Sequence, residues 1–146
     1  MRSRHSRGNE SGLVHHPVAL IGSAHEWSSR ALGSLLQARG YAVLLAHTGA
    51  ATRDQARTSQ PDLILLDTTL TDMDDLELCR ALRDDPLVAR TPIITLSEEP
   101  TTEGKRLAAL QAGASDVLSP PLRLEDVYRK VDACMGTMRA AAELPE

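Results

Sequence analysis

The fold is decided by residues 61–83, which read PDLILLDTTLTDMDDLELCRALR. The stretch opens with an apolar run that ends in Asp67, and a near-continuous apolar run is typical of a parallel strand buried on both faces of a sheet. Over about residues 75–84 the apolar side chains recur at three- and four-residue spacing, which predicts a helix with one buried face. The stretch therefore indicates a central strand, a polar loop and a covering helix.

The same alternation continues on both sides of this stretch. Strands are expected at residues 18–21, 41–45, 62–67, 92–96 and 116–119. Helices are expected from Ser23 to Gly40, at 49–59, at about 75–84, at 101–112 and from near Arg123 onward. Ser23 and Glu26 have the spacing of a capping box, so we expect their side chains to cap the first helix. Five strands that alternate with five helices predict right-handed βαβ units and one doubly wound five-stranded parallel sheet.

The chain of 146 residues has the length of a single domain. Residues 1–16 are polar and rich in arginine, without hydrophobic periodicity, and are expected to form a mobile tail. The folded domain is expected over residues 17–135. Residues 136–146 are expected to extend the last helix or to form a second tail.

Composition and charge exclude several classes of function. The net charge is −4 and the aromatic residues are Trp27, Tyr41 and Tyr128, so no nucleic-acid surface is expected on this domain. No apolar run approaches the length of a membrane span, and no apolar segment follows the basic residues 1–7. We therefore expect a cytoplasmic protein without a membrane partner. The two cysteines lie within helical patterns and are expected to be free thiols.

Candidate functional residues gather where the expected strands end. In a doubly wound sheet, ligands and catalytic groups meet at the carboxyl ends of the strands. Those ends carry Gly22 and Ser23, Asp67, Ser97 and Pro120. A charge at the end of an apolar strand must face a cleft or find a partner, so Asp67 is the strongest candidate for chemistry.

Three stretches resemble the receiver domain of bacterial two-component response regulators. They are residues 61–83, TPIITLS at 91–97 and AGASDVLSPP at 112–121. The resemblance covers about residues 17–135 and implies a flavodoxin-like fold with three α/β/α layers. It also implies a signalling domain in a phosphorelay, not an enzyme, that accepts a phosphoryl group from a histidine kinase.

By this resemblance Asp67 occupies the phosphoacceptor position, and Ser97 supplies the hydroxyl that senses the phosphoryl group. Asp67 and the backbone carbonyl of Thr69 stand where the family's magnesium ligands lie. If the domain accepts phosphate in this way, Mg²⁺ is its cofactor; otherwise no cofactor is expected. The bond between Pro120 and Pro121 is expected to be cis, as the family's lysine–proline bond is.

Several positions depart from the family's pattern. The pair of acids that holds magnesium is replaced by Gly22 and Ser23, the lysine after the fifth strand by Pro120, and the aromatic switch residue by Val117. Magnesium is usually anchored by one or two carboxylates together with phosphate. A missing unit charge at about 4 Å is worth about 4 kcal/mol at an effective dielectric constant near 20. We therefore expect a degenerate pseudo-receiver that acts as a phosphorylation-independent interaction module.

Two other functions stay open. In one, Asp67 is the site of a functional phosphoacceptor response regulator. In the other, the chain is a small α/β enzyme, although it has neither a glycine-rich phosphate loop nor a recognisable nucleophile–base pair. The expected partner is a protein: a histidine kinase, an output domain, or a second copy that forms a homodimer through the last helix. The candidate interface residues on that helix are Leu124, Val127, Tyr128, Met135 and Met138.

Overall fold

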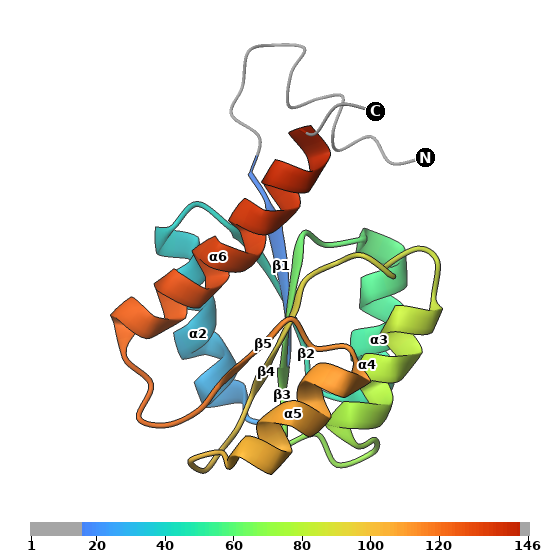
Figure 1. Ribbon diagram of the computed structural model, residues 1–146, viewed down its shortest axis with the longest axis vertical. Helices are drawn as coiled ribbons and strands as arrows, with labels where there is room; N and C mark the ends of the chain where they lie inside the picture. The colour runs from blue at the N-terminus through green and yellow to red at the C-terminus, as the bar shows by residue number, and fades with distance from the viewer. Residues whose placement is uncertain (1–15, 144–146) are drawn as a thin grey trace.

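The computed structural model describes residues 16–143 and the side chains of residues 16–136. Its centre is a five-stranded parallel sheet with the strand order β2-β1-β3-β4-β5 (Figure 1). The strands are β1 (Val18–Gly22), β2 (Ala42–Ala46), β3 (Leu63–Asp67), β4 (Ile93–Leu96) and β5 (Asp116–Leu118). The predicted doubly wound parallel sheet is confirmed.

Helices cover both faces of this sheet. They are α2 (Glu26–Ala38), α3 (Gly49–Ser59), α4 (Asp75–Asp84), α5 (Glu103–Ala112) and α6 (Leu124–Glu143). Helices α2 and α6 lie on one face, and α3, α4 and α5 lie on the other (Figure 1). Every expected strand and helix is present, with ends that differ from the expected ones by a few residues.

Strand β3 anchors both layers of the core. All of its residues are buried, and alternate side chains enter two different clusters. Leu63 and Leu65 pack with residues of α2 and α6, whereas Ile64 and Leu66 pack with residues of α3, α4 and α5. Full burial of each such side chain contributes roughly 1.5–3 kcal/mol, so this strand holds the two helical layers together. Its last residue, Asp67, is thereby fixed at the carboxyl edge of the sheet.

The start of α2 differs from the sequence prediction. The helix begins at Glu26, and its N-cap residue, His25, makes no side-chain capping hydrogen bond. The expected capping box between Ser23 and Glu26 is wrong, because the parallel register of β1 and β3 brings the Ser23 hydroxyl to Asp67. Glu26 instead pairs with Arg30 at 2.9 Å on the helix surface.

The acids between β3 and α4 cap two different helices. Asp74 is the N-cap residue of α4 and forms a capping box with Glu77. Asp72 accepts hydrogen bonds from the backbone N–H groups of Gly49 at 2.7 Å and Ala50 at 3.0 Å, at the start of α3. These two hydrogen bonds hold the pKa of Asp72 below its usual value. Helix capping therefore accounts for both Asp72 and Asp74.

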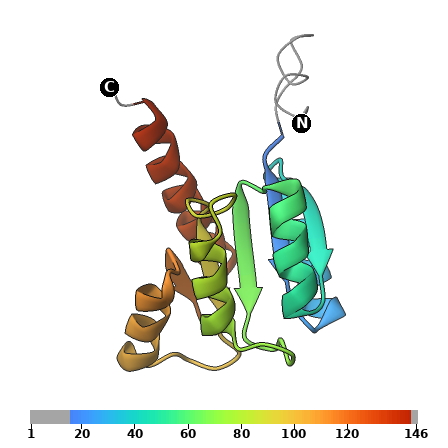
Figure 2. The ribbon, with the colours of Figure 1, turned by 90° about the vertical axis from the view of Figure 1, so that its right-hand side faces the viewer.

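Helix α6 extends beyond the sheet and ends at Glu143 (Figure 2). Its last turns include most of the residues for which the sequence predicts a helix extension or tail. Of the tail predicted at residues 1–16, all but His16 lie outside the described residues. Within the described part of the chain, no helix is long and apolar enough to cross a membrane.

Candidate functional site at the carboxyl edge of the sheet

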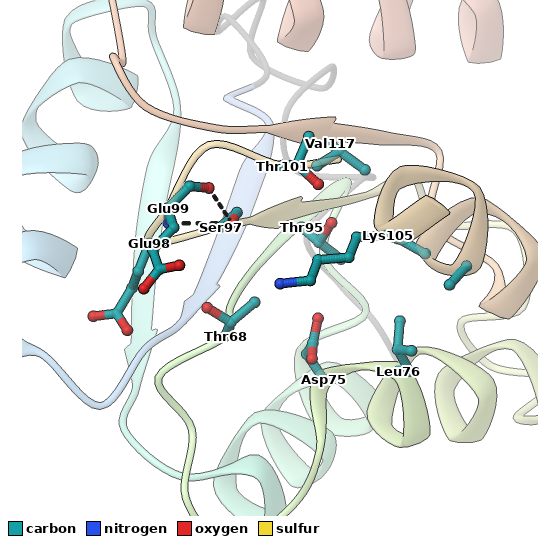
Figure 3. A pocket seen from close by; sticks show the side chains of 12 residues that line it. Thr68, Asp75, Leu76, Thr95, Ser97, Glu98, Glu99, Thr101, Lys105 and Val117 are labelled. Carbon is teal, nitrogen blue, oxygen red and sulfur yellow. Dashed lines mark hydrogen bonds between the residues drawn. The ribbon is translucent and has the colours of Figure 1, made fainter. Parts of the chain in front are cut away.

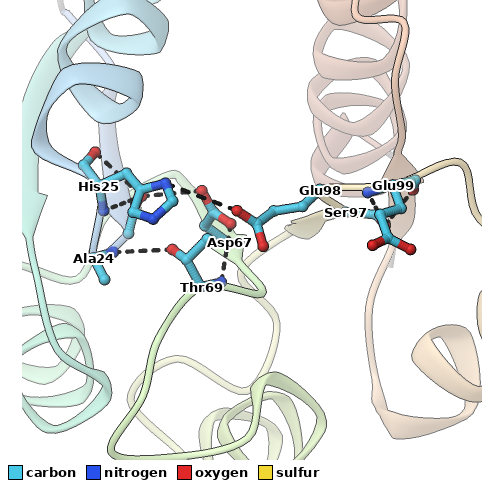
Figure 4. Close-up of polar contacts among 8 residues, drawn as sticks. Ala24, His25, Asp67, Thr69, Ser97, Glu98 and Glu99 are labelled. Carbon is cyan, nitrogen blue, oxygen red and sulfur yellow. Dashed lines mark hydrogen bonds and ion pairs between the residues drawn. The ribbon is translucent and has the colours of Figure 1, made fainter.

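Asp67 is held by two neutral hydrogen-bond donors (Figure 4). The hydroxyl of Ser23 donates to Oδ2 of Asp67 at 3.0 Å, and the backbone N–H of Thr69 donates to Oδ1 at 3.0 Å. Only 8% of Asp67 is exposed. Each carboxylate oxygen thus has a partner in this nearly buried position, and neither partner carries a charge.

The segment after β1 contributes a hydroxyl and a backbone N–H to this site. Ser23 is fully buried, and its Oγ also accepts from the backbone N–H of His25 at 3.1 Å. The next residue is Ala24, whose backbone N–H donates to Oγ1 of Thr69 at 3.2 Å. No carboxylate follows β1 until Glu26, which faces Arg30 instead.

The structure corrects the position predicted for Gly22. A Cβ atom on Gly22 would lie 2.5 Å from Oγ1 of Thr52, on the side of the sheet that α3 covers. Because successive side chains of a strand point to opposite faces, Gly22 cannot face the same space as Ser23. The two residues that reach Asp67 or its loop are therefore Ser23 and Ala24.

Ser97 makes a local turn contact on the loop after β4. Its Oγ donates to the backbone carbonyl of Glu99 at 2.6 Å and accepts from the backbone N–H of the same residue at 3.3 Å. Figure 4 shows these two bonds at a distance from the Asp67 carboxylate. The predicted switch hydroxyl is thus engaged with its own loop.

A cavity of about 440 Å³, which we call the Asp67 cavity, opens in front of Asp67 between α2 and α6. Pro120 lines it, and the bond between Pro120 and Pro121 is cis, as the sequence predicts. At the mouth, Nδ1 of His25 lies 3.8 Å from Oε2 of Glu98, and both side chains are more than half exposed. Its walls are mainly apolar and belong to Trp27, Leu32, Leu35, Leu122, Leu124 and Val127.

The groups around Asp67 do not fit the magnesium site that the resemblance to receiver domains implies. Such a site needs hard oxygen ligands, usually with one or two carboxylates. Among the described groups that hydrogen-bond one another around Asp67, that residue supplies the only carboxylate, and its two oxygens already accept from the Ser23 hydroxyl and the Thr69 N–H. Nor do the described residues include any group of three or more His, Cys, Asp or Glu side chains that could hold a metal ion.

The candidate interface residues of α6 have different environments. Leu124 is 47% exposed, whereas Val127 is 1% exposed and belongs to the core. The Tyr128 hydroxyl donates to the backbone carbonyl of Leu35 at 2.9 Å, which attaches α6 to α2. Met135 packs partly buried against the same core, and the side chain of Met138 lies outside the described ones. Among the four of these residues whose side chains the structure describes, Leu124 presents the largest exposed apolar surface.

Sequence reasoning missed two features of this edge. One is the exposure of Trp27, which is 82% exposed in the first turn of α2, together with Leu122, which is 45% exposed. The sequence could have indicated this exposure, because both are apolar residues that fall outside the three- and four-residue spacing of a buried helix face. The other is a second cavity beside Val117, which no single stretch of sequence indicates.

The chain is similar to known proteins over most of its length. The family model of the response regulator receiver domain matches residues 21–132. The transcriptional regulatory protein KdpE of Mycobacterium tuberculosis is 34% identical over 117 residues, which cover 80% of this chain and 50% of that protein. The response regulator MprA of Mycobacterium avium is 36% identical over 104 residues, which cover 68% of this chain and 42% of that protein. The chain thus spans about half the length of these relatives.

Solved structures share the same architecture. A putative response regulator from Chloroflexus aurantiacus superposes with a TM-score of 0.78 and 26% identity, covering 83% of this chain and 98% of that chain. A two-component response regulator from Clostridium difficile has a TM-score of 0.76 and 28% identity, covering 84% of this chain and 98% of that chain.

Proposed function

Because the chain belongs to the response regulator receiver family, we propose that it acts as an interaction module whose binding does not require phosphorylation of Asp67. The observation that carries this proposal is the pair of hydrogen bonds on Asp67, one from the Ser23 hydroxyl and one from the Thr69 backbone. They satisfy the carboxylate without a cation. The cytoplasmic location expected from the sequence is part of the same proposal.

Charge balance supports this proposal. Phosphoryl transfer depends on positioned cations that neutralise charge spread over the transferring oxygens. Around Asp67, Ser23 supplies a hydroxyl, and Pro120 supplies no donor at all. One missing unit charge at about 4 Å is worth about 4 kcal/mol at an effective dielectric constant near 20, or roughly three orders of magnitude in rate.

The two lysines of the chain do not replace the missing one at Pro120. Nζ of Lys130 donates to Oδ1 of Asp116 at 3.1 Å and to the backbone carbonyl of Val117 at 3.0 Å, so its charge is held at β5. Lys105 lines a different cavity, on the other face of the sheet. The ammonium of Lys130 is therefore not free to neutralise a phosphoryl group on Asp67, and that of Lys105 makes no ion pair or hydrogen bond with Asp67 within the described part of the chain.

One observation favours the alternative, a functional phosphoacceptor. Arg123 lines the Asp67 cavity, so a cationic side chain borders the same space as the carboxylate, although the two form no hydrogen bond or ion pair in the described part of the chain. A guanidinium is a good partner for phosphate oxygens. The experiment below therefore includes an Arg123→Ala variant.

The partner in this proposal is a protein: a kinase, an output domain or a second copy of the chain. Trp27, Leu122 and Leu124 surround the Asp67 cavity and are 82%, 45% and 47% exposed. Burial of apolar side chains is the main driving force of protein association. Self-association through α6 is the form of this proposal that requires no second kind of protein, and Leu124 would lie in that interface.

The test is phosphorylation by acetyl phosphate with Mg²⁺, read by intact mass. We expect no phosphoprotein from the wild type or from Arg123→Ala. As the matched control, Ser23→Asp, Ala24→Asp and Pro120→Lys together restore two acids and a lysine, and this variant is expected to gain a phosphoryl group. Rapid modification of the wild type that Asp67→Asn abolishes would overturn the proposal in favour of the phosphoacceptor.

A further inference from the structure

A second cavity, of about 450 Å³, lies between α4, α5 and strands β4 and β5 (Figure 3). We call it the Thr95 cavity. Thr95 and Val117 are register partners on neighbouring strands and both line it. Its wall on α5 includes Ala108 and Ala109, so small side chains on two elements leave this space open. Cavities of 300–1,000 Å³ are the usual size of small-molecule sites.

The interior of this cavity contains a buried hydroxyl without a partner. Thr95 is only 3% exposed, and its hydroxyl makes no hydrogen bond with any residue that the structure describes. Buried polar groups in native proteins nearly always have a partner, because an unpaired one costs about 1–3 kcal/mol. The partner of the Thr95 hydroxyl is therefore water or a ligand that enters the cavity.

Charged groups of both signs line the same space. Lys105 extends from α5 into the cavity, between Thr95 and Asp75 (Figure 3). Its ammonium forms no ion pair or hydrogen bond within the described part of the chain. Asp75 is half-buried, and burial together with the charge of Asp74 raises its pKa. Glu98 and Glu99 also line the cavity, and of these two Glu98 lies 3.8 Å from Nδ1 of His25 at the mouth of the Asp67 cavity.

The lining thus combines one cation, three acids and a buried hydroxyl. A ligand that complements it carries one anionic group for Lys105, positive charge for the acids and a hydrogen-bond partner for Thr95. Amino acids with a basic side chain have this set of groups: one carboxylate, one α-ammonium and one side-chain cation. Glu98 already pairs with His25, so a neutral or acidic ligand would leave Asp75 and Glu99 without a positive partner.

We propose that the Thr95 cavity binds a free amino acid with a cationic side chain, whose carboxylate pairs with Lys105 and whose two positive groups face Asp75 and Glu99. This site goes beyond the proposed function and does not depend on the state of Asp67. Ser97 and Glu98 line both the Thr95 cavity and the Asp67 cavity. Ligand binding on one face of the sheet can therefore reach the other through the loop after β4.

The test uses backbone amide NMR and isothermal titration calorimetry on the wild-type chain with four probes. L-arginine and L-lysine are expected to bind saturably, with shifts centred on Thr68, Asp75, Thr95 and Lys105. Agmatine, which is arginine without its carboxylate, is expected to bind roughly 10- to 100-fold more weakly, the loss of one charge-assisted hydrogen bond. L-glutamate is expected not to bind.

Variants connect the binding to this cavity. Lys105→Met is expected to bind arginine and agmatine equally, whereas Arg106→Met, which removes a charge from the next position of α5 outside the lining, keeps the wild-type preference. Val117→Phe fills the cavity and is expected to abolish binding; its unfolding curve verifies that it remains folded. Asp67→Asn is expected to bind as the wild type does, so failure of this site is distinct from failure of the proposed function.

Three results would overturn the proposal: no saturable binding of arginine or lysine at millimolar concentration, shifts scattered over the acidic surface, or an unchanged preference for arginine over agmatine in Lys105→Met.

Discussion

Replacement of Ser23 by alanine tests the hydrogen bond that satisfies Asp67. The Ser23 side chain is fully buried, and its hydroxyl donates to Oδ2 of Asp67 at 3.0 Å. A hydrogen bond to a charged group contributes roughly 1.5–3 kcal/mol to stability. Asp67 lines an open cavity, so water can reach the carboxylate and recover part of this loss. We therefore expect Ser23→Ala to lower the free energy of unfolding by about 1.5 kcal/mol, the lower end of that range.

The assay is unfolding in urea, followed by circular dichroism, with a lower midpoint at an unchanged slope. Ser34→Ala is the matched control, because Ser34 is exposed on α2 and its replacement should change stability by less than about 0.5 kcal/mol. The sign of the effect is informative. If position 23 carried an acid, that acid would repel Asp67, and replacing it by alanine would stabilise the domain. Because Ser23 donates a hydrogen bond, replacing it by alanine should destabilise the domain. A Ser23→Ala variant at least as stable as the wild type would refute the interpretation that neutral donors hold Asp67.

Three further predictions concern other buried groups. Thr95→Val is expected to raise the free energy of unfolding by about 1 kcal/mol in urea unfolding without added ligand, because it removes an unpaired buried hydroxyl; destabilisation would mean that the hydroxyl has a partner. Asp75→Asn is expected to stabilise the protein at pH 7, because the pKa of Asp75 is raised in the folded state and its ionisation therefore disfavours folding. Unfolding curves should show this gain in stability shrinking as the pH falls toward the ordinary pKa of 3.8, and a gain that grew there would contradict the prediction. Burial raises the pKa of Cys79 to about 12, so its thiol should resist a thiol reagent at pH 8 until urea unfolds the chain; reaction in the native state would contradict this burial.

The fold could be predicted from sequence because its signals are local and repeated. The run that ends in Asp67 and the helical spacing over residues 75–84 each fit one element, and the structure places β3 and α4 there. Alternation of such elements leaves few topologies, since parallel crossovers are right-handed. The position of Asp67 at the edge of the sheet follows from the same reasoning.

The contacts of the site could be predicted only in part. Ser23 and Glu26 form a local capping pattern, but the pairing of β1 with β3 gives Ser23 a different partner. The prediction that Gly22 and Ser23 face the site differs by one residue from the structure, in which Ser23 and Ala24 do. In a strand, a shift of one residue moves a side chain to the opposite face. The Thr95 cavity depends on side-chain volumes from four separate elements, so no local pattern could indicate it.

The most direct test of phosphorylation-independent action is an amide NMR titration of the wild-type chain with Mg²⁺ and beryllofluoride, the phosphoryl mimic, with Asp67→Asn as the control. We expect no shifts at millimolar Mg²⁺, because Ser23 and Pro120 supply no charge to hold the metal or the anion. Saturable shifts centred on Asp67 and Ser97 that are absent in Asp67→Asn would contradict this expectation and identify a working phosphoacceptor.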